Sequence, residues 1–571
     1  MKRTAVLAMT AFMLILAPGC SSSPSPENSA DIVYFGGPIL TVNDAQPNAE
    51  AIAVKDGKIL QVGSRAELEK NHKGASTQMI DLGGKTMTPG FIDGHSHFIF
   101  AMAVSKQANC TAPPVGPVKN IADLVAALQG FQKERNIPKG EIIMCYGYDG
   151  NELADKREMT RGDLDKAFPD NPVVAIHVSG HGAVLNSAAM KKFGFSSATK
   201  TPPGGVILRK PGSQEPAGLV METAYLPVFA GLPQPTKDQE AQALKDGQMI
   251  YAAAGITTAQ EGATHANDLA VLERGADQNA FFIDIVSYPF ILDLDKVLGE
   301  HPATTFGTYH NHLKLGGVKI VSDGSPQGKT AFFTTPYLTG GPSGQKNWKG
   351  EPTFPQEELN AMVKKVYDDK LQLLVHANGD AAIDMALKAH EAAGGDLAAP
   401  RRTVIIHSQF VRKDQLQKYL DYKMIPSMFT DHVFFFGDVH KKNRGQEQAY
   451  FISPMNTALK MGLHPSNHTD FNVGPIDQTT VMWTAVNRTS RSGELMGADE
   501  RITPAQALRA ITLDAAYQYF EEGSKGSIEA GKRADLVILD QNPLTVDPSK
   551  IIDIKVMETI KDGKSVYKRA Q

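Results

Sequence analysis

The middle of this 571-residue chain alternates short apolar runs with segments of helical period, and few folds accommodate such a pattern. The apolar runs have the length and composition of strands buried on both faces, and they span 171–180, 312–324, 371–380, 402–410 and 422–429. Helices are predicted over 355–369, 381–393 and 503–512. A strand followed by a helix, repeated over roughly 400 residues, favours an α/β fold with a parallel (β/α)8 barrel over an open sheet.

The two ends of the chain differ from this middle. Residues 31–88 contain alternating apolar residues with Lys-Asp-Gly and Gly-Gly turns, which are hairpin signals, and residues 525–571 have the same character. The simplest account is one β-sandwich composed of both ends, with the barrel formed by residues 89–524. Two separate β caps are the alternative. Residues 105–215, rich in Pro and Gly, are expected to form an insertion over one face of the barrel.

Residues 1–20 have the pattern of an export signal. Two basic residues precede an apolar stretch that is too short to span a bilayer comfortably. The Gly19-Cys20 pair is similar to a bacterial lipoprotein processing site, which would make Cys20 the lipidated N-terminus and residues 21–30 a tether. Ordinary signal cleavage is the alternative. We therefore expect an exported protein, either periplasmic or anchored to the membrane as a lipoprotein.

Charge and cysteine content narrow the range of partners. The net charge is −4 and no block of Lys or Arg occurs, which argues against binding to nucleic acid or to a membrane surface. A small-molecule substrate fits better, with membrane contact only through the lipid anchor and with a homodimer as a candidate assembly.

Besides Cys20 the chain has Cys110 and Cys145, for which a disulfide and two separate buried thiols both remain open.

Residue types that bind metal ions follow several of the apolar runs. His95 and His97 come after "MTPGFIDG", and side chains two apart on an extended backbone point to the same side, so both imidazoles can face one ion. Lys319 lies within an apolar run, where its charge is costly to bury unless it is removed or paired. Alone, such residues are more often hydrogen-bonded histidines or a lysine that reaches solvent.

Three further residues occur in the same context. His376 and His407 end two apolar runs, and Asp470 closes the stretch "GLHPSNHTD". Each has a structural alternative, such as a hydrogen-bonded histidine or a turn-forming Asp. Because catalytic residues of parallel barrels lie at the carboxyl ends of strands, their recurrence at this position nevertheless predicts one shared metal site.

Six motifs occur in a fixed order: "TPGFIDGHSH", "VKIVSDGS", "VHANGDAAIDMAL", "VIIHSQ", "TPAQALRAIT" and "GSIEAGKRADLVILDQNPL". Together they resemble the amidohydrolase superfamily, in particular its YtcJ-like metal-dependent hydrolases (amidohydrolase family 3). The resemblance covers nearly all of residues 31–570. It implies a distorted (β/α)8 TIM barrel, a β-sandwich domain made from both termini, and two divalent metal ions, most commonly zinc.

The resemblance also implies roles for individual residues. By position, His95 and His97 would bind the more buried ion, and His376 and His407 the more exposed one. A carboxylated Lys319 (N6-carboxylysine) would bridge the two ions, which turns a costly buried ammonium into an anionic ligand. Asp470 would contact the metal and serve as general base and then general acid.

Four residues are weaker candidates for contacts with substrate. Relatives usually have Gly-Ser-Asp where this chain has His468-Thr469-Asp470, so His468 is an extra imidazole near the presumed base, and Tyr148 stands where they favour tryptophan. Relatives often have a Gln-Pro-x-His element after the seventh strand of the barrel, and in this chain "SMFTDHVFFFGD" offers only His432 there. His181 lies in the element "GHGAVLNS" of the insertion. Packing within loops is the alternative for these side chains.

The expected activity is the hydrolysis of a carbon–nitrogen bond other than a peptide bond, in an amide, N-acyl amine, N-formyl amine or cyclic amide, by a metal-activated hydroxide. Hydrolysis of esters, lactones or phosphotriesters at the same centre is one alternative. A non-catalytic lipoprotein that binds a small solute is another. The set of six strand-end ligands favours the enzymes, because a binding module has no need for them.

Overall fold

The computed structural model describes residues 29–113, 115–150, 152–178, 182–202, 205–232, 236–341 and 345–570. The predicted export signal, Cys20 and His181 lie outside the described residues. The chain is an α/β protein with mixed sheets, which confirms the predicted class. Within the described ranges, no helix has both the length and the apolar character needed to cross a membrane.

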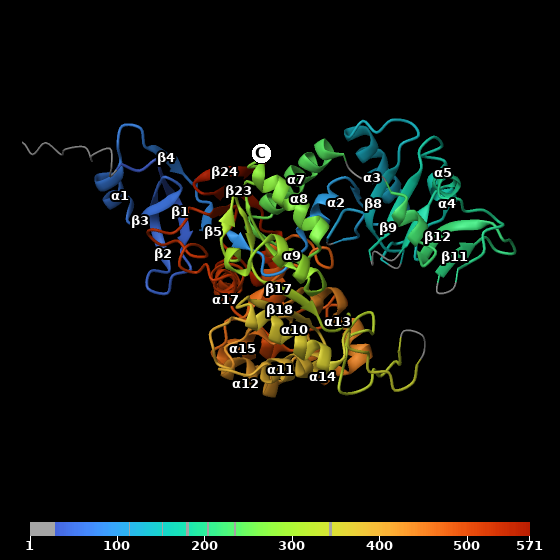
Figure 1. The fold of residues 1–571 in the computed structure, drawn as a ribbon. Helices are drawn as coiled ribbons and strands as arrows, with labels where there is room; N and C mark the ends of the chain where they lie inside the picture. Colours follow the sequence, from blue (N-terminus) through green and yellow to red (C-terminus); the bar gives the residue numbers. More distant parts are fainter. Residues whose placement is uncertain are drawn as a thin grey trace, which may run out of the picture.

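Both ends of the chain contribute strands to one mixed sheet, with the order β24-β23-β22-β5-β1-β2-β3 and with β4 paired to β1. The ends meet where β5 runs antiparallel to β22, with Thr88 opposite Val537. Figure 1 shows these strands, blue and dark red, beside one another although they are far apart in sequence. The elements are β1 (Ile32–Leu40), β2 (Asn48–Lys55), β3 (Lys58–Gly63), α1 (Arg65–His72), β4 (Gln78–Asp81), β5 (Thr86–Pro89), β22 (Leu536–Leu539), β23 (Val556–Lys561) and β24 (Lys564–Lys568).

The centre of the molecule contains two five-stranded sheets whose strands are parallel except for β15. The first has the order β15-β16-β14-β13-β6, and the second has the order β17-β18-β19-β20-β21. Their strands are β6 (Phe91–Ile92), β13 (Ile256–Thr264), β14 (Asp284–Pro289), β15 (Tyr309–His310), β16 (Leu313–Leu315), β17 (Val318–Val321), β18 (Leu373–Ala377), β19 (Val404–His407), β20 (Ile425–Met428) and β21 (Ser466–Asn467). The predicted runs at 312–324, 371–380, 402–410 and 422–429 are confirmed as strands of this region.

The two central sheets meet at both edges. Phe290, directly after β14, forms a parallel bridge with Lys319 of β17. At the other edge, the backbone N–H of Asp470 donates to the carbonyl of His95 over 3.0 Å. One buried apolar cluster contains side chains from both sheets, among them Ile92, Val286, Leu374, Ile406 and Ile425.

Helices follow most of these strands, and the three helices predicted from sequence period are confirmed as α10, α11 and α17. The helices of this region are α2 (Phe98–Val104), α7 (Lys237–Ala253), α8 (Ala266–Asp277), α9 (Leu294–Glu300), α10 (Gln356–Asp368), α11 (Asp380–Ala393), α12 (Lys413–Asp421), α13 (Asp431–Arg444), α14 (Gln446–Tyr450), α15 (Met455–Lys460), α16 (Gln478–Asn487), α17 (Pro504–Ala510) and α18 (Leu513–Gln518). Short 3-10 helices span Ile291–Asp293, Ala303–Thr305, Ala498–Glu500 and Pro548–Asp553.

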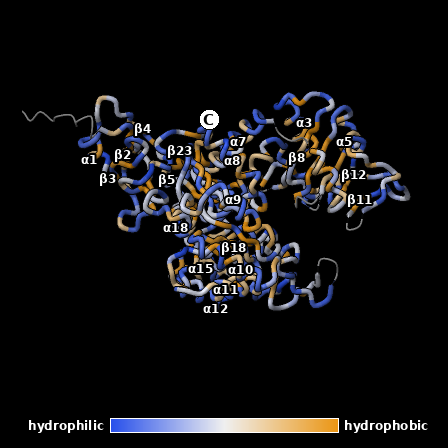
Figure 2. Tube along the Cα trace, in the orientation of Figure 1, coloured by the Kyte–Doolittle hydropathy of each residue, from blue (hydrophilic) through white to orange (hydrophobic). Residues whose placement is uncertain are grey.

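The insertion forms a separate lobe at the right of Figure 1, built on a sheet with the order β11-β12-β10-β9-β8-β7. The run at 171–180 is a strand, β9, but it pairs within this lobe. Figure 2 shows hydrophobic stretches gathered inside the lobe and inside the central part. The elements are β7 (Ala108–Asn109), α3 (Ile121–Glu134), β8 (Ile143–Tyr148), α4 (Arg161–Asp165), β9 (Val173–His177), β10 (Gly182–Leu185), α5 (Ser187–Lys192), β11 (Gly205–Arg209), β12 (Pro216–Glu222) and α6 (Leu226–Ala230).

Cys110 and Cys145 lie in the core of this lobe as free, buried thiols. The sequence left open a disulfide or two free thiols, and in the structure the two thiols are free.

The sheet shared by the two chain ends leads to a stability prediction. Leu536 is fully buried and packs in one cluster with Ile52 and Met87 from the other end of the chain. We expect Leu536→Ala to lower the free energy of unfolding by about 2–5 kcal/mol, because the cavity it leaves spans the contact between the ends. Leu544, 38% exposed, is the matched control, and Leu544→Ala should have little effect. Equal urea midpoints for the two variants would contradict the shared core.

Candidate metal centre

Two histidines and one carboxylate form the first part of the site. His95, His97 and Asp470 each offer a ligand atom, and these atoms lie within 4.8 Å of one another. Asp470 Oδ1 is 3.5 Å from His95 Nε2 and 3.7 Å from His97 Nε2. The turn after β6 therefore directs both histidines toward the residue that follows β21.

The second part of the site comes from the ends of β18 and β19. His407 Nε2 is 3.1 Å from His376 Nδ1, and His407 Nδ1 is 4.0 Å from Asp470 Oδ2. His468 Nε2 lies 3.2 Å from His407 Nδ1, so this extra imidazole belongs to the same cluster. Side chains from the ends of four strands, β6, β18, β19 and β21, thus meet in this cluster.

Lys319 extends from β17 into the middle of this cluster. Its Nζ is 3.0 Å from His95 Nε2, and the residue is 1% exposed. Burial lowers the pKa of Lys319 to about 7, and the opposing effects of Asp470 and Glu261 do not restore it. A large part of the Lys319 amine is therefore neutral and nucleophilic near pH 7.

Burial also determines the charge of the histidines. It lowers the pKa of His376 to about 3 and holds the pKa values of His95, His407 and His468 well below the usual value. Neutral imidazole is the form that binds a metal ion. Burial raises the pKa of Asp470 to about 6, although His97 and Lys319 oppose this shift.

Gln260 of β13 fixes the orientation of His95. Its Oε1 lies 2.5 Å from His95 Nδ1, while its Nε2 donates to the carbonyl of Gly94 over 2.9 Å and to the hydroxyl of Tyr519 over 2.8 Å. An acceptor at Nδ1 keeps the proton there and leaves Nε2 of His95 free for a metal.

Buried acids hold the ends of the strands around the cluster. Asp93 accepts from the hydroxyl and the backbone N–H of Thr469, which ties the loop after β6 to the loop after β21. Asp323 lies 3.5 Å from His376 Nε2 and accepts from three backbone N–H groups, of Phe332, Asn378 and Gly379. Burial raises the pKa of both acids to about 7.

Sequence reasoning assigned no role to Gln260, Glu261, Asp93 or Asp323. Asp93 and Asp323 lie within two of the motifs quoted above, so their position in those motifs was an available signal. Gln260 and Glu261 are two consecutive polar residues that interrupt a β-like run, and this interruption was the signal that could have indicated them.

A cavity of about 1910 Å³ opens beside His97 and Glu261. Its volume exceeds the roughly 300–1,000 Å³ of a typical small-molecule pocket, so a small substrate would fill only part of it. The central part contributes Phe100, Phe435, Phe436 and Phe471, and the insertion contributes Tyr146, Asp149 and His177. The insertion therefore forms one wall of the space next to the cluster.

The weaker substrate candidates have different positions. His468 belongs to the cluster, whereas His432 is buried behind it, with Nδ1 3.0 Å from Nε2 of His440. Tyr148 does not line the cavity: its hydroxyl donates to Glu158 Oε2 over 2.9 Å inside the core of the insertion. The β8 strand has a register irregularity between Cys145 and Tyr148, which turns Tyr148 inward. The structure describes nothing of His181.

Comparisons with known proteins agree with this arrangement. The family profile described as "Amidohydrolase family" matches residues 78–567. The N-substituted formamide deformylase of Arthrobacter pascens is 26% identical and covers 94% of this chain and 98% of its own length. The putative amidohydrolase YtcJ of Bacillus subtilis (strain 168) is also 26% identical, over 94% of this chain and 99% of its own. An uncharacterized metal-dependent hydrolase from Pyrococcus horikoshii OT3 shares the fold, with a TM-score of 0.69, 23% identity, and coverage of 90% of this chain and 99% of that structure.

The contact between Gln260 and His95 leads to a prediction about metal affinity. We expect Gln260→Leu to weaken metal binding by about 10–100-fold, because the His95 ring loses the partner that fixes its orientation and tautomer. Gln248 is an equally buried glutamine that bonds only to backbone groups away from the site, so Gln248→Leu is the matched control. Competition titration with a metal-binding dye measures both variants, and equal affinities would contradict the role of Gln260.

Proposed function

Because the chain belongs to the amidohydrolase family and is a metal-dependent hydrolase of non-peptide carbon–nitrogen bonds, we propose that it deacylates a small N-acyl or N-formyl amine or opens a cyclic amide. The observation that carries this proposal is the convergence of the predicted ligands around Asp470. The full-length similarity to a formamide deformylase supports the N-formyl class in particular. The comparisons give no support to ester hydrolysis or to solute binding without catalysis.

We further infer that the central strands close into a distorted (β/α)8 barrel. The contacts at both edges of the two central sheets support closure, as does the apolar cluster that contains residues of both. In such barrels, the carboxyl ends of the strands carry the active site. The sheet built from both chain ends supports a β-sandwich domain made from both termini. That domain and the residue boundaries 31–88, 89–524 and 525–571 stay predictions.

The donor set fits two divalent metal ions. It supplies imidazole nitrogen atoms, one carboxylate shared between two groups of histidines, and one amine, from His95, His97, Lys319, His376, His407 and Asp470. Nitrogen and carboxylate donors in a nearly dry site suit zinc. We propose zinc as the metal and a carbamate on Lys319 as the bridge. The neutral amine of Lys319 adds to carbon dioxide and loses one proton, which yields an anionic ligand.

When bound, the two ions would lower the pKa of a water molecule and polarise the substrate carbonyl. Asp470 accepts the proton of the attacking water at its carboxylate and returns it to the leaving nitrogen. Its pKa, raised to about 6 by burial, suits both steps near neutral pH. His97 and Glu261 border the cavity, so the scissile bond lies on their side and the rest of the substrate extends toward the insertion.

Export remains a proposal that rests on residues 1–20. We propose that the chain is secreted and that Cys20 carries a lipid anchor, since Gly19-Cys20 follows an apolar stretch of signal length. A homodimer likewise stays a prediction.

The activity is tested with the purified protein loaded with zinc or manganese on formamides, N-acyl amino acids, hydantoin-like rings and esters. We expect turnover of at least one amide. Asp470→Asn should retain the metal and lose about 10²–10⁴-fold in kcat, because the proton acceptor is gone. Asp499→Asn, at an exposed position, makes the same chemical change and should be as active as the native protein. Hydrolysis of esters alone, or an active Asp470→Asn variant, would contradict the proposal.

The proposed bridge is tested at Lys319. We expect Lys319→Ala to reduce the metal content from two ions per chain toward one and to lower kcat, because the change removes the proposed bridging ligand and leaves Asp470 as the shared carboxylate. Elemental analysis and a rate assay measure the two effects. If the variant kept its full metal content and the native rate, the carbamate would be ruled out and the centre would be one built on histidines alone.

A further inference from the structure

A second cavity, of about 690 Å³, lies at the opposite ends of the central strands. Lys314 of β16 lines it, together with residues 371–372 just before β18 and residues 400–401 just before β19. His376 and His407 lie at the carboxyl ends of the same strands, β18 and β19. The second cavity is therefore separated from the metal centre by the length of the strands, and the proposed function makes no use of it.

The wall of this cavity is strongly cationic. One acidic residue, Glu521, lines it, against five basic residues: Lys314, Lys370, Arg401, Lys525 and Arg533. Such an excess favours an anionic ligand, because the charges act in a space that is partly shielded from water.

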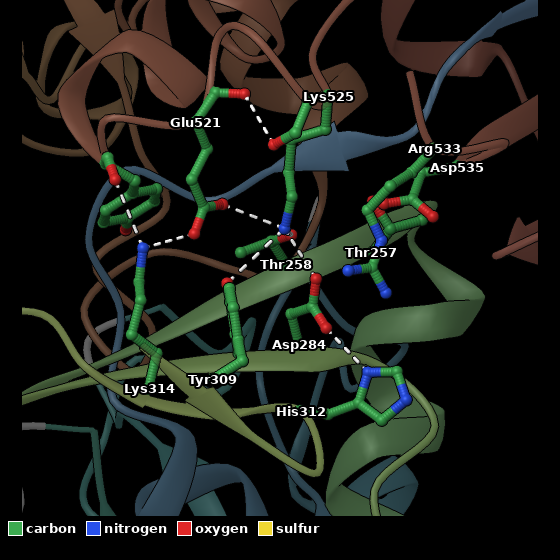
Figure 3. A network of polar contacts seen from close by, with 12 residues as sticks. Thr257, Thr258, Asp284, Tyr309, His312, Lys314, Glu521, Lys525, Arg533 and Asp535 are labelled. Atoms are coloured by element: carbon green, nitrogen blue, oxygen red, sulfur yellow. Dashed lines mark hydrogen bonds and ion pairs between the residues drawn. The ribbon is translucent and has the colours of Figure 1, made fainter. Parts of the chain in front are cut away.

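Three of these cations already have partners. Lys314 and Lys525 both contact Glu521, and Lys525 Nζ is 2.6 Å from Asp284 Oδ2 (Figure 3). Arg533 pairs with Asp562 over 2.6 Å. The ion pairs of Lys314 and Lys525 are buried and form the floor of the cavity. Lys314 contacts two acceptors, Glu521 and the carbonyl of Tyr519, so one of the three N–H groups of its ammonium is left over.

Lys370 and Arg401 are different. Neither has a carboxylate partner among the residues that the structure describes. Arg401 donates to the carbonyl of Asp396 over 2.6 Å, and its guanidinium lies 4.7 Å from the centre of the Tyr367 ring. Stacking on an aromatic ring holds the guanidinium plane in place while leaving its other N–H groups available to an oxyanion.

Aromatic rings complete the wall. Phe306, Tyr309, Tyr367, Tyr519 and Phe520 all line the cavity. Phe520 is 51% exposed and has a φ of 60°, a left-handed backbone that is disfavoured for a bulky side chain. Strain of this kind concentrates at binding sites. The rings provide flat apolar surface next to the unpaired cations.

We propose that this cavity binds a small ligand in which an oxyanion, a carboxylate or a phosphate, is joined to a planar apolar group. The oxyanion is held by Arg401 and Lys370, with the remaining N–H of Lys314 behind them. The planar group packs against Tyr367, Tyr519 and Phe520. The volume suffices for such a ligand.

The test is calorimetric titration of the metal-loaded protein with benzoate and, separately, with phenyl phosphate, at constant ionic strength. The two probes distinguish carboxylate from phosphate recognition, and uncharged benzyl alcohol tests the need for the anion. The double variant Lys370→Gln/Arg401→Gln removes the two unpaired cations. Lys388→Gln/Arg501→Gln makes the same charge change at two exposed positions outside the cavity and is the matched control.

We expect saturable binding of at least one probe to the native protein and the control, and affinity weaker by about tenfold or more in the double variant. The native rate of hydrolysis should persist in the double variant, which shows that the metal centre is intact. Binding of neither probe would overturn the proposal. Equal affinity in the double variant and the native protein would also overturn it, because the anion would then sit at the metal centre or elsewhere.

Discussion

The free-energy cost of burying charge governs the centre of this molecule. Five histidines, a lysine and an aspartate meet at this point, and burial lowers the pKa values of four of the imidazoles and of the amine, which favours their neutral forms. Neutral nitrogen donors side by side have few ways to satisfy one another. Surrounding side chains, such as Gln260 beside His95 and Asp323 beside His376, contact only some of the ring nitrogen atoms. A divalent cation resolves this shortage, which is why the same burial that shifts the pKa values also prepares a metal site.

Much of this arrangement was predictable from sequence because β18 and β19 are short apolar runs that end in histidine. The strands β13 and β14 were not anticipated. Strand β13 reads ITTAQEGAT, in which Gln260 and Glu261 break the apolar pattern, and these polar residues are buried because they serve the cluster. Tyr148 was misassigned because the irregularity in β8, with Gly147 at a φ of 80°, reverses the alternation of strand side chains. The binding of metal by the cluster itself stays a prediction.

Tyr519 connects the cationic cavity to the residues that support the metal cluster. Its carbonyl accepts from Lys314 over 3.2 Å at the cationic cavity, whereas its hydroxyl donates to the carbonyl of Asp93 over 2.6 Å and contacts Gln260. Gln260 in turn orients His95. The loop after α18 is thereby attached to both ends of the central strands, and its rigidity contributes to the precision of the metal-binding geometry.

The distance along the chain between the first and last of these contacts has a consequence for biogenesis. His95 has Asp470 as its neighbour, and Tyr519 supports it through Gln260. The sheet shared by the two chain ends is completed only by β24. A nascent chain on the ribosome therefore cannot assemble the full donor set before translation is almost finished. The proposed metal site is therefore complete only after synthesis. If the chain is exported unfolded, as residues 1–20 predict, its ions would come from the compartment in which it arrives.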